Sequence, residues 1–176
     1  MILNLACGEN PIKDAVNVDI LPLSGVDKIV DLTKFPWEWK DNSVSYIFML
    51  HYLEHCQDPK RVIEECWRIL KPGAILHITV PHSSSVSGIG CLGHYRTFSF
   101  NTLNDYLTRQ FYMFDKPLFY PVTQKIVWIH TDNCILKLLS IPIQFLIDQS
   151  PRFFERFWCF YVGGAVEVRF LGLKRV

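Results

Sequence analysis

Short apolar runs, separated by turn residues, dominate the first half of the sequence. Each run is three to seven residues long, is mostly apolar, and is bounded by Gly, Pro, Asn or Asp. The runs cover residues 2–6, 15–20, 28–30, 44–50 and 74–80. Strands that are buried on both faces have this pattern, and such strands are typical of parallel sheets. The pattern therefore predicts five strands of a mostly parallel sheet.

One helix is well defined by its start, its apolar face and its end. Asp58 is a suitable N-cap, Pro59 suits the first turn, and Lys-Pro-Gly at 71–73 ends the helical pattern. The residues on the shared apolar face are Val62, Ile63, Cys66, Ile69 and Leu70. Because this helix lies between two predicted strands, we expect residues 44–80 to form a βαβ unit with a right-handed crossover.

The second half of the chain combines a Ser/Gly-rich segment with further short elements. Residues 83–93 have the composition of a mobile loop. The elements expected beyond it are a helix at about 102–109, a strand at 124–130, helical segments at 134–148 and 152–160, and a strand at 165–171. No repeat or linker divides the sequence, so we expect one domain over residues 1–176. The predicted fold class is α/β, a Rossmann-like three-layer sandwich whose mostly parallel sheet has an antiparallel closing strand.

Composition limits the classes of function. Hydrophobic residues make up 49% and charged residues 20% of the 176 residues, and the formal net charge is +1. Because Lys and Arg form no run, the sequence gives no electrostatic support for a nucleic-acid partner. The six cysteines are scattered and form no Cys-x-x-Cys pair, which argues against a zinc knuckle or a disulfide framework. This cysteine usage favours a reducing compartment, and we expect a cytoplasmic localisation.

Residues 134–161 are more apolar and aromatic than a surface helix pair needs. The longest apolar stretch without a charge, residues 138–147, is shorter than the roughly 20 residues of a spanning helix and contains Pro142. We therefore predict no transmembrane segment, and the residues after Met1 have the pattern of a strand rather than of a signal peptide. We expect residues 134–161 to cover the thin face of the sheet, and a homodimer contact through this segment is a second expectation.

Chemically versatile residues lie where the predicted strands end. Ala6 and Gly8 follow the first strand, and their small size lets the backbone approach a ligand closely. Asp19 and Asp31 follow the second and third strands, where a carboxylate can accept hydrogen bonds from a ribose diol or an exocyclic amine. Each of these residues alone is explained as well by a turn or a cap. Together, at successive strand ends of one parallel sheet, they predict a nucleoside site.

These residues belong to a series of motifs that resembles the class I S-adenosylmethionine-dependent methyltransferases, in particular the type 11 methyltransferase domain. The motifs are Leu-Asn-Leu-Ala-Cys-Gly at 3–8, Asn-Val-Asp-Ile at 17–20, Asp-Leu at 31–32 with Phe-Pro-Trp at 35–37, Asp-Asn-Ser-Val-Ser-Tyr-Ile at 41–47, His-Tyr-Leu-Glu-His at 51–55 and Arg-Ile-Leu-Lys-Pro-Gly-Ala at 68–74. They identify residues 1–82 as the expected cofactor-binding half. Residues 83–176 are expected to form the substrate-binding and closing half.

The resemblance implies that S-adenosylmethionine is the cofactor. The turn after the first strand is implied to hold the methionine portion, the end of the second strand the ribose, the third the adenine and the fourth the sulfonium. The residues implied in these contacts are, in that order, Asn4, Ala6, Cys7, Gly8 and Asn10; Asp19 and Ile20; Asp31 and Leu32; and Leu50 and His51.

Two features depart from the usual pattern of that family. Ala6 and Asn10 occupy positions where the family usually has Gly, so the glycine turn is thinned. Ten residues separate Gly8 from Asp19 and eleven separate Asp19 from Asp31, which leaves little room for full crossover helices. One face of the sheet is therefore expected to be thinly covered by the first half of the chain.

His51-x-x-Glu54-His55 also has the spacing of a zinc-peptidase motif, H-x-x-E-H. Zinc binding by this motif needs both histidines on one face of a continuous helix, together with a further ligand. The five residues directly follow a predicted strand and precede the helix start at Asp58, so we expect no long helix through them. We therefore predict no metal site. The alternative that His51 and His55 are merely packed strand-end residues stays open.

Candidate catalytic and substrate-binding residues follow the fourth and fifth strands. His94, Tyr95 and Arg96 leave the Ser/Gly-rich segment, while His55 and His82 lie closer to the strand ends. Because histidine titrates near neutrality and can accept a proton, His94 and His55 are the predicted catalytic residues. His82, Tyr95 and Arg96 are the predicted substrate contacts, since an arginine can clamp a carboxylate or phosphate. An ordinary polar loop is the alternative.

The predicted reaction is transfer of the sulfonium methyl group to an O or N atom of a small-molecule acceptor. Such a protein must align acceptor, methyl group and sulfur and exclude water, and it needs no covalent intermediate. A catalytically silent S-adenosylmethionine-binding module is one alternative, which the thinned turn favours. A Rossmann-like oxidoreductase is another, although no G-x-G-x-x-G opens a helix in this sequence.

Overall fold

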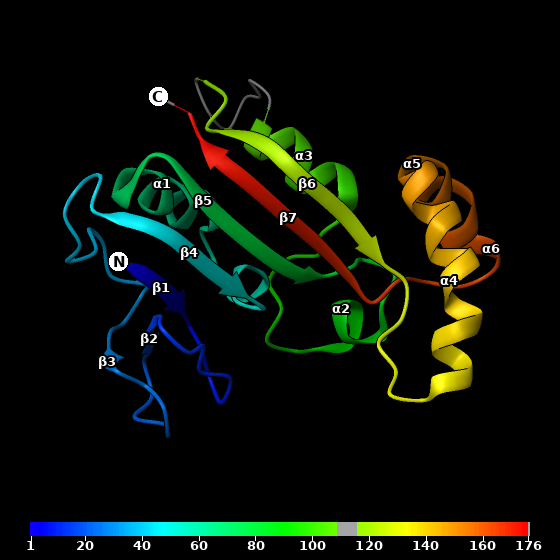
Figure 1. Cartoon of the computed structure of the whole chain (residues 1–176), viewed down its shortest axis with the longest axis horizontal. Helices are drawn as coiled ribbons and strands as arrows, with labels where there is room; N and C mark the ends of the chain where they lie inside the picture. Colours follow the sequence, from blue (N-terminus) through cyan, green and yellow to red (C-terminus); the bar gives the residue numbers. More distant parts are fainter. Residues whose placement is uncertain (109–115, 176) are drawn as a thin grey trace.

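A seven-stranded sheet runs through residues 1–108 and 116–175, which are the residues described by the computed structural model of the chain (Figure 1). The strands are β1 (Ile2–Leu5), β2 (Val16–Asp19), β3 (Lys28–Ile29), β4 (Val44–Leu50), β5 (Leu70–Pro81), β6 (Phe119–Val127) and β7 (Glu167–Lys174). Their order in the sheet is β3-β2-β1-β4-β5-β7-β6. The pairs from β3 to β5 are parallel, whereas β7 is antiparallel to β5 and β6. This confirms the predicted Rossmann-like sheet with an antiparallel closing strand.

The predicted helix after β4 is present with the expected cap. The helical elements of the described residues are η1 (Leu53–His55), α1 (Pro59–Ile69), α2 (Val86–Gly90), α3 (Phe100–Thr108), α4 (Cys134–Gln149), α5 (Pro151–Phe153), the π-helical turn η2 (Phe154–Trp158) and α6 (Cys159–Tyr161). Asp58 accepts the N–H of Arg61 at 3.1 Å at the start of α1. Val62, Cys66 and Ile69 are buried on its apolar face. Helix α1 therefore completes the βαβ unit between β4 and β5.

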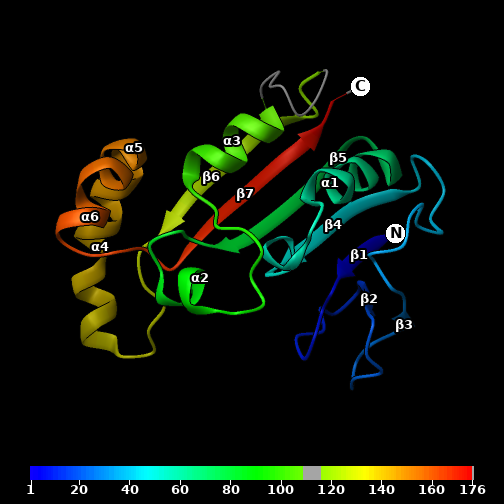
Figure 2. The ribbon, with the colours of Figure 1, turned by 180° about the vertical axis from the view of Figure 1, so that it is seen from behind.

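The main core lies between the sheet and the two helices α1 and α3, which cover the same face (Figure 2). Along β4, Ile47 and Met49 are fully buried, whereas the alternate residues Tyr46 and Phe48 are only partly buried. This alternation is expected for a strand with one face on the core. The connections from β1 to β2 and from β2 to β3 contain no helix within the described residues. The short spacing between Gly8, Asp19 and Asp31 predicted that these connections cover the sheet only thinly.

The expectation that residues 134–161 cover this thin face is wrong. Helix α4 lies beside the far end of β6, away from β1, β2 and β3 (Figure 1). Gln144 of α4 accepts the N–H of Trp128 at 3.0 Å and donates to the carbonyl of Ile126 at 2.7 Å. Strand β6 is at the edge of the sheet, where unpaired backbone groups attract such a partner.

Within the described part of the chain, every helix is too short or too polar to cross a membrane.

The Ser/Gly-rich segment 83–93 was expected to be a loop, but it contains the short helix α2. Ser85 caps this helix, because its hydroxyl accepts the N–H of Gly88 at 2.7 Å. The helix expected at 102–109 begins two residues earlier, at the start of α3. Its last expected residue, Arg109, lies outside the described residues.

The strands expected at 124–130 and 165–171 occur as β6 and β7, with shifted bounds. Their limits follow from their mutual antiparallel register, which pairs Phe119 with Lys174 at one end. Such long-range pairing is not visible in either segment alone.

Arg68 on α1 is the centre of a polar network that holds the segment before β4. Its guanidinium donates to Glu65 Oε2 at 2.7 Å, to the carbonyl of Trp37 at 3.0 Å and to that of Trp39 at 2.9 Å. A further bond of 2.6 Å joins it to Asp41. The backbone N–H of Trp37 in turn donates to Glu65 Oε2 at 2.8 Å. The network thus connects α1 to the segment before β4. The sequence motif around Arg68 did not predict this contact.

We expect Arg68→Ala to lower the free energy of unfolding by about 2–3 kcal/mol, because it leaves the nearly buried Glu65 carboxylate without its cation. The estimate is below that for a fully buried pair because the Arg68 side chain is 26% exposed. Urea denaturation is the measurement. The control is Lys13→Ala at an exposed position, expected within about 0.5 kcal/mol of the parent. A loss no larger than that of the control would contradict the network's role.

Candidate active site

The turn after β1 is built on two residues with left-handed backbone. Ala6 and Gly8 both have φ of 53°, which glycine adopts freely and alanine at a cost of about 1 kcal/mol. The N–H of Gly8 donates to Asp19 Oδ2 at 2.8 Å, and the other carboxylate oxygen accepts the N–H of Leu21 at 3.0 Å. Asp19 therefore joins the ends of β1 and β2. Each of its oxygens still has a lone pair for a ligand.

Two of the residues that are predicted to contact the cofactor have buried side chains, which pack beneath the turn after β1. Asn4 is 1% exposed, and its amide donates to the carbonyl of Asn10 at 3.1 Å and to Asn17 Oδ1 at 2.9 Å. Cys7 is also buried, and burial raises the pKa of its thiol. Because both side chains are buried, they support the turn, and the contact predicted between these two residues and the cofactor stays a prediction. Asn10 itself is exposed.

The residues predicted for the adenine side lie at the ends of β2 and β3. Ile20 is exposed, whereas Leu32 is buried and lines a cavity of about 480 Å³. Asp31 accepts hydrogen bonds from the Thr33 hydroxyl at 2.6 Å and from its N–H at 3.0 Å, and these bonds lower the pKa of Asp31. The structure thus brings Leu32 to a cavity and keeps Asp31 ionised beside it.

The same cavity connects this side with the predicted acceptor side. Its lining includes Tyr52, His55 and Tyr95 besides Leu32. A second cavity of about 640 Å³ is lined by Leu53, Asp58, Tyr95, Arg96, Thr102 and Tyr106, among others. Tyr95 lines both cavities, so residues from the two halves of the chain meet at this place.

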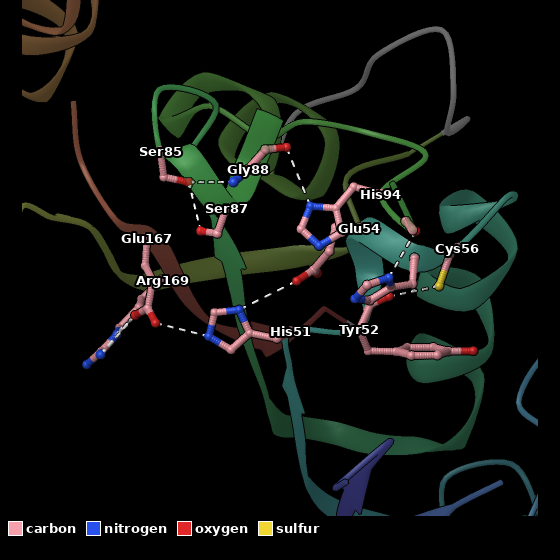
Figure 3. A network of polar contacts seen from close by, with 12 residues as sticks. His51, Tyr52, Glu54, Cys56, Ser85, Ser87, Gly88, His94, Glu167 and Arg169 are labelled. Carbon is pink, nitrogen blue, oxygen red and sulfur yellow. Dashed lines mark hydrogen bonds and ion pairs between the residues drawn. The ribbon is translucent and has the colours of Figure 1, made fainter. Parts of the chain in front are cut away.

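His51, at the end of β4, is turned towards β7. Its backbone is left-handed with φ of 56°, and its Nε2 lies 3.0 Å from Glu167 Oε1 (Figure 3). This bond, together with Glu54, raises the pKa of His51 to about 9. Burial alone would raise the pKa of Glu167, but hydrogen bonds from His51, His130 and Arg169 lower it to about 2. His51 is therefore a cation paired with Glu167, beside the half-buried Leu50.

Sequence reasoning missed Glu167 and His130 altogether. Glu167 opens β7 and pairs in register with Pro81 at the end of β5, which brings it to the carboxyl edge of the parallel strands. His130 Nε2 lies 2.9 Å from Glu167 Oε2. No motif marks either residue, and the only signal in the sequence is that Glu167 is an acidic residue within the strand expected at 165–171.

The predicted catalytic residues His55 and His94 are neighbours. His55 ends η1, and His94 lies between α2 and α3. Their ring centroids are 4.6 Å apart, and the rings meet edge to face. The N–H of Tyr95 donates to the Glu54 carbonyl at 2.9 Å, which fixes the later segment against η1. The structure therefore brings together two histidines that are 39 positions apart in the sequence.

Of the three predicted substrate contacts, His82 is misplaced. It is 2% exposed, its Nδ1 lies 2.7 Å from the Ser84 hydroxyl and its Nε2 lies 3.0 Å from Glu155. Both ring nitrogens are occupied inside the protein, so the predicted substrate role is corrected to a structural one. Tyr95 and Arg96 are exposed, and both contact Gln57. The side-chain amide of Gln57 donates to the Tyr95 hydroxyl at 3.3 Å, and the Arg96 guanidinium donates to the Gln57 backbone carbonyl at 3.4 Å.

Comparison with known proteins agrees with this picture. Residues 21–78 match the model of the family described as Methyltransferase domain. None of the curated protein sequences compared with the chain matches it. Among solved structures, an S-adenosylmethionine-dependent methyltransferase from Archaeoglobus fulgidus is similar with a TM-score of 0.63 and 16% identity, over 98% of this chain and 85% of that one.

Two further structures are similar at the level of the fold. An S-adenosylmethionine-dependent methyltransferase from Mesorhizobium loti has a TM-score of 0.58 and 15% identity, over 98% of this chain and 89% of that one. Phosphoethanolamine N-methyltransferase 2 from Haemonchus contortus, in complex with S-adenosyl-L-methionine, has a TM-score of 0.57 and 14% identity, over 99% of this chain and 48% of that one. Residues 21–78 therefore match the methyltransferase domain family, and the fold of the chain is that of S-adenosylmethionine-dependent methyltransferases.

Proposed function

We propose that the chain binds S-adenosylmethionine at the carboxyl ends of β1, β2 and β3. The observation that carries this proposal is the bond from the Gly8 N–H to Asp19 Oδ2, which joins the ends of β1 and β2. The backbone of Ala6, Gly8 and Asn10 would face the methionine portion, and the remaining lone pairs of Asp19 would accept the ribose hydroxyls. This is the usual place for a nucleoside in an open parallel sheet.

The adenine would lie beside Ile20, Asp31 and Leu32, where an ionised carboxylate can accept from the exocyclic amine and an apolar side chain can contact the ring. The sulfonium end would then reach the end of β4, at Leu50 and the backbone of His51. In this arrangement the methyl group would point towards the cavity that is lined by Leu32, His55 and Tyr95.

For the reaction we propose methyl transfer to an O or N atom of a small molecule. The two adjoining cavities give room for an acceptor, and Tyr95 and Arg96 border them. Arg96 supplies a positive charge that would bind an acidic group of the acceptor. His55 and His94 would contact the acceptor nucleophile and accept its proton where the acceptor requires it.

The test is an assay with methyl-labelled S-adenosylmethionine and a pool of small metabolites, followed by mass spectrometry. We expect label in one acceptor class and release of the demethylated cofactor. Cofactor binding without transfer to any acceptor would contradict the catalytic proposal and identify a silent binding module. Binding of a nicotinamide cofactor instead would identify an oxidoreductase.

We also propose that residues 134–161 form a homodimer contact. The outward face of α4 carries exposed apolar side chains, of which Leu138, Leu139, Phe145 and Leu146 are 60–68% exposed. Such a continuous apolar surface is unusual on a monomer. Sedimentation equilibrium should therefore show a dimer, and Phe145→Asp should weaken the association by at least about 10-fold, since a charge would be buried. Lys40→Asp, an exposed change at a distant site, is the control. A monomer at all concentrations would contradict the contact.

A further inference from the structure

We propose that Glu54, His55 and His94 form a binding site for a divalent transition-metal ion such as Zn²⁺. One ligand atom of each side chain lies within 4.8 Å of the ligand atoms of the other two. The set combines two imidazoles with one carboxylate, which are common ligands of zinc. It differs from the H-x-x-E-H arrangement because His94, from the second half of the chain, takes the place of His51.

The carboxylate of Glu54 is the first reason to place a cation here. Glu54 is 1% exposed, and within the described part of the chain neither carboxylate oxygen has a hydrogen-bond partner. Its Oε1 lies 3.5 Å from Nδ1 of the His51 cation, which Glu54 shares with Glu167 at 3.0 Å. One shared imidazolium at this distance neutralises the buried Glu54 carboxylate only in part. A metal ion at this place would supply the remaining positive charge.

The orientation of the two histidines is the second reason. Nδ1 of His94 lies 3.4 Å from the carbonyl oxygen of Gly88 (Figure 3). Nδ1 of His55 lies 3.0 Å from the carbonyl oxygen of Gly93. A carbonyl oxygen only accepts, so each Nδ1 carries the proton and each Nε2 keeps a free lone pair. Histidines that bind metals usually have this arrangement, with the second nitrogen donating to a carbonyl or carboxylate.

The ligand atoms of the three side chains need to approach one another only slightly to hold an ion. Ligands of a tetrahedral zinc lie about 3.4 Å apart, since the bonds are about 2.0–2.2 Å long. His55 is exposed and His94 is half-buried, so their rings can move by the required distance of about 1 Å. The bond from the Tyr95 N–H to the Glu54 carbonyl at 2.9 Å keeps the two segments together meanwhile.

Three protein ligands leave one position of a tetrahedral ion open, as in catalytic rather than structural zinc sites. Because His55 also lines the cavity shared with Leu32, the open position would face the predicted acceptor. With the ion bound, His55 and His94 would act as its ligands rather than as proton acceptors, and the ion would hold an acceptor oxygen near the methyl group, a role that rests on the proposed function. The site itself does not, because it is argued from Glu54, His55 and His94 alone. This proposal departs from the expectation of no metal, whose argument considered His51 as the second histidine.

The test is calorimetric titration of the chelator-treated, dialysed protein with Zn²⁺, without S-adenosylmethionine. We expect one ion per chain, with affinity reduced at least about 10- to 100-fold in His55→Ala and in His94→Ala. Glu54→Gln keeps the shape of the side chain and should weaken binding as well. The control is His130→Ala, which removes an exposed histidine outside the trio and should leave the affinity unchanged.

Thermal unfolding gives a second readout that does not depend on heats of binding. Saturating Zn²⁺ should raise the midpoint of the parent and of His130→Ala, but not that of His94→Ala. Absence of stoichiometric binding, or equal loss in His130→Ala and His94→Ala, would overturn the proposal. Asp19→Ala separates it from the proposed function, because that variant should lose cofactor affinity while keeping its affinity for Zn²⁺.

Discussion

Replacing His94 with Gln is expected to lower the rate constant of methyl transfer by roughly 10²–10⁴-fold, once an acceptor is known. Gln has similar size but can neither take up a proton nor supply an imidazole lone pair. The side chain of His94 lies next to His55 and outside the turn that joins β1 and β2. Its loss should therefore leave the affinity for S-adenosylmethionine near that of the parent. Steady-state kinetics and calorimetry on the same preparation measure both quantities.

His130→Gln is the matched control for this variant. His130 is about half exposed like many surface histidines, and its contact is with Glu167 rather than with the acceptor side. We expect its turnover to stay within a few fold of the parent. Unchanged turnover in His94→Gln would remove that residue from the reaction and leave alignment of the substrates as the source of catalysis.

Asp19→Ala is expected to weaken cofactor binding by about 1.5–3 kcal/mol, roughly 10- to 150-fold, the range for a hydrogen bond to a charged group. The carboxylate both orients the Gly8 N–H and supplies the proposed ribose contact. Calorimetry with S-adenosylhomocysteine, the demethylated cofactor, measures the loss. The control is Asp132→Ala, which removes an exposed carboxylate far along the chain. Equal affinity of Asp19→Ala and the parent would show that Asp19 does not contact the ribose.

The first half of the fold was predictable because its signals are local. The cap at Asp58 and the apolar spacing on α1 each act within a few residues, and the structure has both. The short apolar runs similarly became β1, β2, β3, β4 and β5. The second half depends on contacts between distant segments. The placement of α4 follows from Gln144 bonding to the edge of β6, and no local pattern in α4 contains that information.

The candidate site likewise contains some residues that could be predicted from the sequence and others that could not. Asp19 and Gly8 were identified because strand ends of a parallel sheet converge, and the structure joins them directly. His82 met the same positional criterion and proved to be buried, because its partner Glu155 comes from a helix 73 positions later. The proximity of Glu54 and His94 likewise depends on a later segment of the chain, which is bonded to η1 through the Tyr95 N–H. Position at a strand end thus predicts proximity to a site, but not which way a side chain turns.

The central claim is that the edge formed by Asp19 and the turn after β1 binds S-adenosylmethionine, and direct titration tests it. Calorimetry of the unmodified chain with S-adenosylhomocysteine should give one site per chain, with competition by S-adenosylmethionine and none by a nicotinamide dinucleotide. Absence of binding, or binding of the nicotinamide dinucleotide in place of both adenosyl compounds, would contradict the account.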